Sequence, residues 1–292
     1  MSDAIMDILR DIGSRGLPTL AIVLVALWIG KLINDLLTRY KLDEELTAKN
    51  NASVGVAMAG YYIGLAIAIS GVVMGPESDT LGKDVLGVAI YSLISIVLLN
   101  VSAFINDKLI LYRFNNESEL VNDQNSGTGA TMAGSYLATG LIVNAAVSGE
   151  VAGGWWKGLL ACLIFFALGQ VVLVIAGLWY QRITSYDIHK VIGEDNNVAA
   201  GIGFGGFLFA MGYVVRAAMT GASVSWSADL VSFALYVVVA LILLTITQAI
   251  TDKVFLPKAK ISDEIGNQGN IAAAVIVAAI YASVAFLIVS AV

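Results

Sequence analysis

The sequence predicts an all-α membrane protein with eight transmembrane helices, built from four parallel two-helix repeats. Hydrophobic residues make up 58% of the 292 positions and charged residues only 13%, whereas about a quarter of the residues in soluble domains are charged. Long uncharged stretches alternate with short charged segments, and one asparagine-containing pattern recurs four times. The stretches lack a polar residue at every second position, which excludes a transmembrane β-barrel.

Eight stretches are long enough to cross a bilayer. A hydrocarbon core needs about 20 helical residues, and a helix satisfies its own backbone hydrogen bonds in lipid. The first stretch, 16–30, has to continue past Lys31 to reach that length. The other seven are uncharged over 50–76, 85–106, 124–149, 158–181, 196–215, 230–251 and 265–292.

Each repeat begins its second predicted helix at an asparagine, and the four asparagines are 74, 72 and 73 residues apart. A fixed period of this kind indicates duplication of one supersecondary unit. The asparagines are predicted to cap the second helices, because an asparagine side chain accepts a hydrogen bond from a free backbone N–H at a helix start. They are Asn51, Asn125, Asn197 and Asn270.

The repeats divide the chain into segments of one integral membrane domain. Residues 1–16 are predicted to form a short amphipathic segment on the outer surface, because apolar residues such as Met6 and Ile8 are interspersed with acidic ones. The repeats, each with two transmembrane helices, span 17–84, 85–155, 156–228 and 229–292.

Basic residues predict the orientation of the chain. The loops within the repeats hold 11 lysines and arginines, whereas the opposite side holds five. By the positive-inside rule these loops are cytoplasmic and both termini lie outside. A unit of two spans returns the chain to its starting side, so all four repeats have the same orientation and are related by an axis along the membrane normal. Two arrangements are open: one ring of four units, or two pairs.

Small residues recur four positions apart in the second helix of each repeat. Residues at this spacing share one helix face and let another backbone approach closely. One interpretation is tight helix packing, and the other is a narrow path along which the glycines leave room for a substrate. The glycines concerned are Gly55, Gly60, Gly64, Gly129, Gly134, Gly201, Gly205 and Gly206.

Acidic residues stand at the cytoplasmic end of the first helix in three repeats, at Asp35, Asp107 and Asp252, and Gln181 replaces the acid in the third. They either end the helices and pair with neighbouring lysines, or form an acidic ring at a pore mouth that favours cations. On the outer side, Arg216 either extends its charge to the membrane surface, with Asp229 or Glu150 as a partner, or contacts an anion or substrate.

The sequence contains few of the residues and motifs on which catalysis usually depends. The single histidine, His189, and the single cysteine, Cys162, exclude a multi-histidine or multi-cysteine metal cluster and a disulfide within the chain. No GxSxG, HExxH or phosphate-loop motif is present. We therefore predict no enzymatic activity, no catalytic residue, no metal and no cofactor. The net charge of −6 argues against nucleic acid as a partner, which leaves membrane lipids, other membrane proteins or a second copy of the chain.

The repeat unit resembles the DUF350 family, also called UPF0719. The resemblance is carried by Glu-Leu/Ile-x4-Asn at 45–51, 119–125 and 264–270, and by Gly-x3-Ala-Gly-x3-Gly at 55–64. The third repeat departs from the first motif with Val191, and the fourth has alanines at the glycine positions. The resemblance covers 17–292 and implies a location in a bacterial inner membrane, without an activity to transfer.

Two classes of function are open for such a protein. The first is a pore or transporter-like permeation protein for ions or small solutes, which a continuous hydrated path lined by the three acids would favour. The second is a structural or interaction scaffold of a membrane-stress system, which packs with partner proteins or lipids. A solid, dry bundle with a flat glycine-rich face would favour the scaffold.

Overall fold

A computed structural model describes residue 6 and residues 12–73, 80–148, 155–220, 226–254 and 260–291. Every regular element in these residues is helical, and eight helices are long and apolar enough to cross a membrane, which confirms the predicted all-α class with eight transmembrane helices. The first helices of the repeats are α2 (Leu17–Leu37), α4 (Leu81–Ile105), α7 (Trp155–Ile183) and α9 (Trp226–Val254). The second helices are α3 (Ala52–Val73), α6 (Ser126–Ser148), α8 (Val198–Met219) and α11 (Ile271–Ser290).

Short helical turns connect these spans. One turn lies ahead of each second helix: η2 (Glu44–Ala48), α5 (Asn116–Val121), η4 (Lys190–Glu194) and α10 (Ile261–Gly266). Two more, η1 (Ile12–Gly16) and η3 (Asn106–Ile110), are continuous with α2 and α4. Most of the predicted surface segment at 1–16 lies outside the described residues, so its placement stays a prediction.

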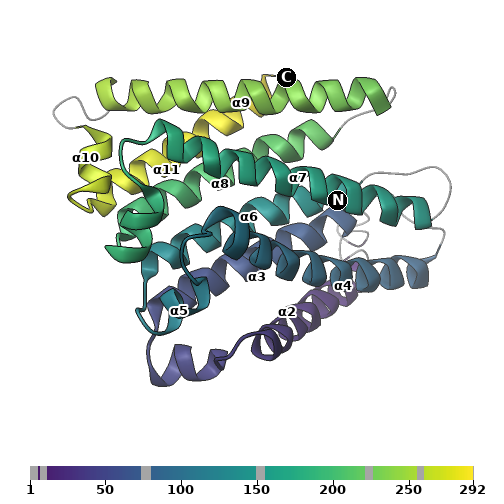
Figure 1. The fold of residues 1–292 in the computed structure, drawn as a ribbon. Helices are drawn as coiled ribbons and strands as arrows, with labels where there is room; N and C mark the ends of the chain where they lie inside the picture. Colours follow the sequence, from purple (N-terminus) through teal and green to yellow (C-terminus); the bar gives the residue numbers. More distant parts are fainter. Residues whose placement is uncertain are drawn as a thin grey trace.

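The spans form two layers (Figure 1). The second helices lie in one row in the order α3, α6, α8, α11, and the first helices lie along one side of this row. Each first helix after α2 lies across two second helices: α4 on α3 and α6, α7 on α6 and α8, and α9 on α8 and α11. Because α3 and α11 are at opposite ends, the row is open. The arrangement therefore differs from both the ring and the two pairs that the sequence left open.

Burial follows position in the row. In the most apolar part of α6 and of α8, 72% of the residues are buried, against 17% in α2. The middle helices have neighbours on both sides and first helices above them, whereas α2 presents side chains such as Leu36, 81% exposed, to the surroundings. Large apolar residues on the outside of a membrane protein face lipid, so these helices are suited to their exposed positions.

Aromatic side chains gather in two places along the row of second helices. In the first half of the chain, the ring of Tyr61 lies edge-on to that of Tyr136, with centroids 5.4 Å apart. In the second half, Phe207 meets Tyr281 in the same way at 5.4 Å, and Tyr180 of α7 stacks on Phe204. The two edge-to-face contacts join neighbouring second helices, α3 with α6 and α8 with α11, and the stacked contact joins α7 to α8.

Candidate functional site

The boundary between adjacent repeats combines close contact between helix backbones with hydrogen bonds from buried polar side chains. Its centre is backbone contact between second helices. A Cβ atom added at Gly60 would lie under 3.0 Å from Ala133, one at Gly134 under 3.0 Å from Gly205, and one at Gly206 under 3.0 Å from Ala278. Most of these neighbours are backbone atoms, which cannot move aside without separating the helices. The small residues therefore bring helices together and leave no gap between them.

The other predicted glycines divide into two groups. A Cβ at Gly64, Gly129, Gly201 or Gly205 would likewise strike the backbone of a neighbouring second helix. Gly55 differs, because only the side chain of Leu46 lies near it, at 3.6 Å. Gly55 belongs to α3, the end of the row, where no further second helix follows.

The three helix interfaces use one register. The ninth residue after each repeat asparagine contacts the eighth residue after the next asparagine, in the pairs Gly60–Ala133, Gly134–Gly205 and Gly206–Ala278. We call the positions 2, 9, 13 and 20 residues after a repeat asparagine the leading face of its helix. We call the positions 4, 8 and 15 residues after it the trailing face. The leading face of one helix packs on the trailing face of the next.

A tight turn places the asparagine at the start of each second helix. The residue before it has a positive φ angle in all four repeats: 50° at Asn50, 47° at Gln124, 50° at Asn196 and 63° at Gly269. Asparagine and glycine tolerate this left-handed conformation better than most residues. The backbone N–H of the repeat asparagine then donates to the carbonyl six residues earlier, at 2.8–3.0 Å in every copy. One recurrent turn therefore precedes all four second helices.

The asparagine side chain joins two repeats. Its Oδ1 atom accepts from the backbone N–H three residues on, for example from Thr128 at 3.1 Å and from Ala200 at 2.9 Å. In three repeats Nδ2 also donates to a loop carbonyl of the next repeat: Asn51 to Leu120 at 2.8 Å, Asn125 to Ile192 at 2.6 Å, and Asn197 to Ile265 at 2.7 Å. Since these bonds connect equivalent helix starts, the second helices run parallel.

A glutamate completes this cluster in three repeats. Glu45, Glu119 and Glu264 accept from the Nδ2 atom of their asparagines at 2.9, 2.8 and 2.6 Å. Burial opposes ionisation of Glu45, but hydrogen bonds from Lys49 and Asn51 and the charge of Lys49 outweigh it, so the Glu45 pKa is lowered. At Glu119 burial dominates over the hydrogen bond from Asn125, and the pKa is raised.

The predicted acids act within their own loops. The Oδ1 atom of Asp35 accepts from the backbone N–H of Leu42 at 2.8 Å, and that of Asp107 accepts from Asn116 at 3.0 Å. In the third repeat the neutral Gln181 accepts from Ile188 at 2.9 Å in the same way. Because the neutral Gln181 accepts the same kind of bond, the role that these side chains share is to hold the backbone of the loop, and it does not require a charge. The side chain of Asp252 lies outside the described residues.

A second polar chain crosses the row near the other end of the second helices. Arg216 donates from Nε to the Oδ1 of Asn144 at 2.8 Å, and Asn144 donates to the carbonyl of Ile67 at 2.8 Å and to Ser70 at 3.1 Å. Arg216, Asn144 and Ser70 occupy the same position in their repeats. Of the two predicted partners of Arg216, Asp229 lies on α9 and Glu150 lies outside the described residues. The bond to Asn144 runs to the neighbouring second helix.

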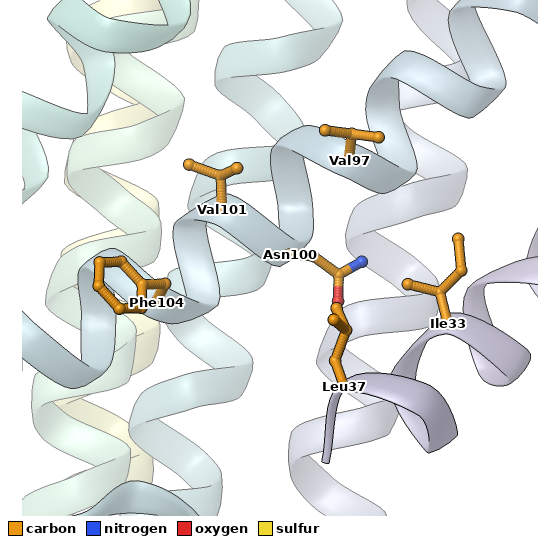
Figure 2. A pocket seen from close by; sticks show the side chains of 6 residues that line it. All are labelled: Ile33, Leu37, Val97, Asn100, Val101 and Phe104. Carbon is orange, nitrogen blue, oxygen red and sulfur yellow. The ribbon is translucent and has the colours of Figure 1, made fainter.

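An apolar groove of about 340 Å³ lies between α2 and α4, in the layer of first helices (Figure 2). Asn100 is its polar side chain, and its amide donates to the Tyr61 hydroxyl at 3.1 Å and to the Ile96 carbonyl at 2.8 Å. The rest of the lining is Ile33, Leu37, Val97, Val101 and Phe104. Asn100 is thus the one polar residue among the six that line the groove.

The histidine and the cysteine lie in different environments. His189 is buried, with Nε2 2.9 Å from the carbonyl oxygen of Ile110, and burial lowers its pKa, which favours the neutral ring. Arg113 pairs with Asp187 beside it, which ties the loops of the second and third repeats. Cys162 is buried within α7. In the described part of the chain, no three His, Cys, Asp or Glu side chains are grouped to hold a metal ion.

Sequence reasoning missed the bonds from each asparagine to the next repeat. The turn itself left a signal, because asparagine or glycine precedes the repeat asparagine in three of four copies. The partner carbonyls left none, since every residue has a carbonyl and only the packing of the repeats selects Leu120, Ile192 and Ile265.

Comparison with known proteins gives two matches. The family model described as Domain of Unknown Function (DUF350) matches residues 12–147 and 154–292, so each matched segment contains two of the four repeats. A UPF0719 transmembrane protein of Aquifex aeolicus (strain VF5) is 25% identical over 253 residues, which cover 85% of this chain and 88% of that protein. No solved structure matches the chain.

Proposed function

The chain belongs to the DUF350 family of transmembrane proteins, and we propose that it serves a bacterial inner membrane as a non-enzymatic scaffold that packs with lipids and partner proteins. The observation that carries this proposal is the backbone contact along the row of second helices. Rigid, closely packed helices suit a structural element in the bilayer. Such contact requires small residues on both helices, and the repeats supply them at each boundary.

A permeation path along the small-residue faces finds no support in the same contacts. A path needs space between helices, whereas a single added Cβ at Gly60, Gly134 or Gly206 already meets the neighbouring helix. The acids give limited support to a pore, because Asp35 and Asp107 each hold a loop N–H and a nearby lysine. A pore or transporter-like role for ions or small solutes is therefore the second candidate.

Absence of enzymatic activity is supported by what the chain offers chemically. Cys162 is buried in a membrane-spanning helix, and His189 is buried in a loop with its Nε2 beside a backbone carbonyl. Neither has the exposed, activated arrangement of a nucleophile or a general base.

The proposed orientation keeps the basic loops in the cytoplasm and both termini outside. Support comes from the basic residues in the loops ahead of the second helices, including Lys49 and Arg113. Cysteines introduced at positions 41 and 115, in a variant without Cys162, should be shielded from membrane-impermeant thiol reagents in intact cells. Labelling from outside would reverse the orientation.

Vesicle flux separates the scaffold from the pore. Purified protein in lipid vesicles should pass neither monovalent cations nor small solutes under imposed gradients. A matched variant changes Asp35, Asp107 and Asp252 to asparagine and should behave identically, because an amide oxygen still accepts the loop N–H. Cation flux that the triple variant abolishes would overturn the scaffold and establish the acidic mouth.

A further inference from the structure

The two ends of the row carry complementary faces, and we propose that a second copy of this chain docks there head to tail. The leading face of α11 in one copy would pack on the trailing face of α3 in the next. This inference rests on the proposed scaffold function and names the partner. It follows from three features: the small residues, the asparagine bonds and the burial of α2.

The leading face consists of small residues in every repeat. In the first three repeats these residues are buried or partly buried against the next second helix. In α11 all four are exposed. The four sets are Ser53, Gly60, Gly64, Gly71; Gly127, Gly134, Ala138, Ala145; Ala199, Gly206, Ala210, Ala217; and Ala272, Ala279, Ser283, Ser290.

The trailing face is also built from small residues in every repeat. In α6, α8 and α11 this face meets the preceding second helix. In α3, at the beginning of the row, Ala59 and Ala66 are exposed and Gly55 is partly so. The sets are Gly55, Ala59, Ala66; Gly129, Ala133, Gly140; Gly201, Gly205, Gly212; and Ala274, Ala278, Ala285.

Lipid alone gives no reason for this pattern at the ends. Fluid acyl chains pack equally well on large side chains, and α11 exposes such residues beside its leading face, including Phe286 at 44% and Leu287 at 68%. Small residues matter where another backbone comes close. Within the chain they occur at the same register wherever two second helices meet, so both open ends match the existing interfaces.

In the part of the chain that the structure describes, the asparagine bonds that join neighbouring repeats are present at the first three repeats and not at the fourth. Asn51, Asn125 and Asn197 each donate to a carbonyl five residues before the next repeat asparagine. For Asn270 the described residues supply no equivalent carbonyl from a following repeat. Within the described residues, Nδ2 of Asn270 bonds only to Glu264, which leaves one of its two hydrogens for another acceptor. The carbonyl of Leu46 in a second copy holds the matching position.

The helix α2 points to the same missing neighbour. The helices α4, α7 and α9 each lie on the second helix of the preceding repeat as well as on their own. In the described residues α2 packs on its own second helix, α3, but not on that of another repeat as the other first helices do, and it is the least buried span. In the head-to-tail assembly α11 of another copy would fill that place. Such a contact joins two different faces, so repeated contacts build a closed ring or an open filament.

Disulfide trapping in native membranes tests this register. The pair equivalent to Gly206–Ala278 is Ala279 of one copy and Ala59 of the next. Two differently tagged chains, both with Cys162→Ala, would be co-expressed, one with Ala59→Cys and the other with Ala279→Cys. Mild oxidation should produce a mixed-tag dimer. Leu36→Cys with Leu235→Cys is the matched control, because both positions are exposed on first helices, and it should give no dimer.

Substitution at the same sites provides a second readout. Ala59→Leu and Ala279→Leu should each shift the protein in lipid nanodiscs from multiple copies to one, with unchanged helix content, since both positions are exposed in a single chain.

Three outcomes would overturn the proposal: no mixed dimer, dimers only between two copies of Ala59→Cys, or wild-type protein that is monomeric in nanodiscs. Ion flux by the purified protein would refute the scaffold function instead, and it is measured independently of the cross-link.

Discussion

The middle of the row and its ends present the same faces to different surroundings. Between α6 and α8, Gly134 meets the backbone of Gly205, whereas the equivalent residue of α11, Ala279, is exposed. The sequence of the face is nearly constant while its burial is not. The difference teaches that one small-residue face is buried where a second helix packs on it and is exposed at the end of the row.

The largest expected effect contrasts Gly134→Leu with Ala279→Leu. A leucine at position 134 has no space, because the obstructing atoms belong to the Gly205 backbone. Overpacking typically costs about 1–3 kcal/mol and occasionally more, and a rigid backbone obstacle places the expected cost at the upper end. At position 279 the same side chain enters open surroundings, and a monomeric detergent preparation should be nearly unaffected. Unfolding in increasing denaturing detergent measures both, and equal loss in the two variants would contradict the comparison.

The repeat asparagines should show an intermediate effect. In the same monomeric preparation, Asn125→Ala removes the helix cap and the bond to the buried loop carbonyl of Ile192. Asn270→Ala removes a cap and the bond to Glu264 alone. Loss of a cap costs about 1 kcal/mol, and an unpaired buried acceptor adds about 1–3 kcal/mol.

Asn125→Ala should therefore be the more destabilising of the two substitutions in denaturation experiments. Asn125→Asp serves as the control, since it keeps the cap acceptor and loses the Nδ2 donor. Equal stability of Asn125→Ala and Asn270→Ala would show that the bond between repeats contributes nothing.

The glutamates of the first two repeats should respond to pH with opposite signs. The lowered pKa of Glu45 gives a stabilising contribution that is present above the ordinary carboxyl pKa of 4.5 and is lost as the pH falls through the folded-state value. The raised pKa of Glu119 gives the reverse: stability is greatest below 4.5 and declines as the pH rises through the folded-state value.

Substitution by glutamine separates these two contributions. At neutral pH, Glu45→Gln should lower the melting temperature, because it removes the charge that Lys49 stabilises. Glu119→Gln should leave the melting temperature unchanged or raise it slightly. Melting curves between pH 4 and pH 7 measure both, and the same direction of change in the two variants would remove the distinction between the repeats.

The sequence predicts the eight spans well, because hydrophobic length is a local property. Asn51 and its equivalents could be placed at helix starts from their position in the repeat alone. The row could not be predicted, since a set of small residues on a helix does not reveal whether it meets one neighbour or two. The bond from Arg216 to Asn144 could not be predicted for a related reason: the sequence does not show which side chain helix packing brings beside the guanidinium.

The most direct test of the account is an electron cryomicroscopy map of the protein in lipid nanodiscs at a resolution that shows lipid and ordered water. The account predicts continuous contact between α3, α6, α8 and α11, with no water or ion density between them. It also predicts acyl-chain density along the exposed sides of the first helices. It also predicts α11 of one copy against α3 of another. A ring of helices around a hydrated path lined by Asp35, Asp107 and Asp252 would contradict it.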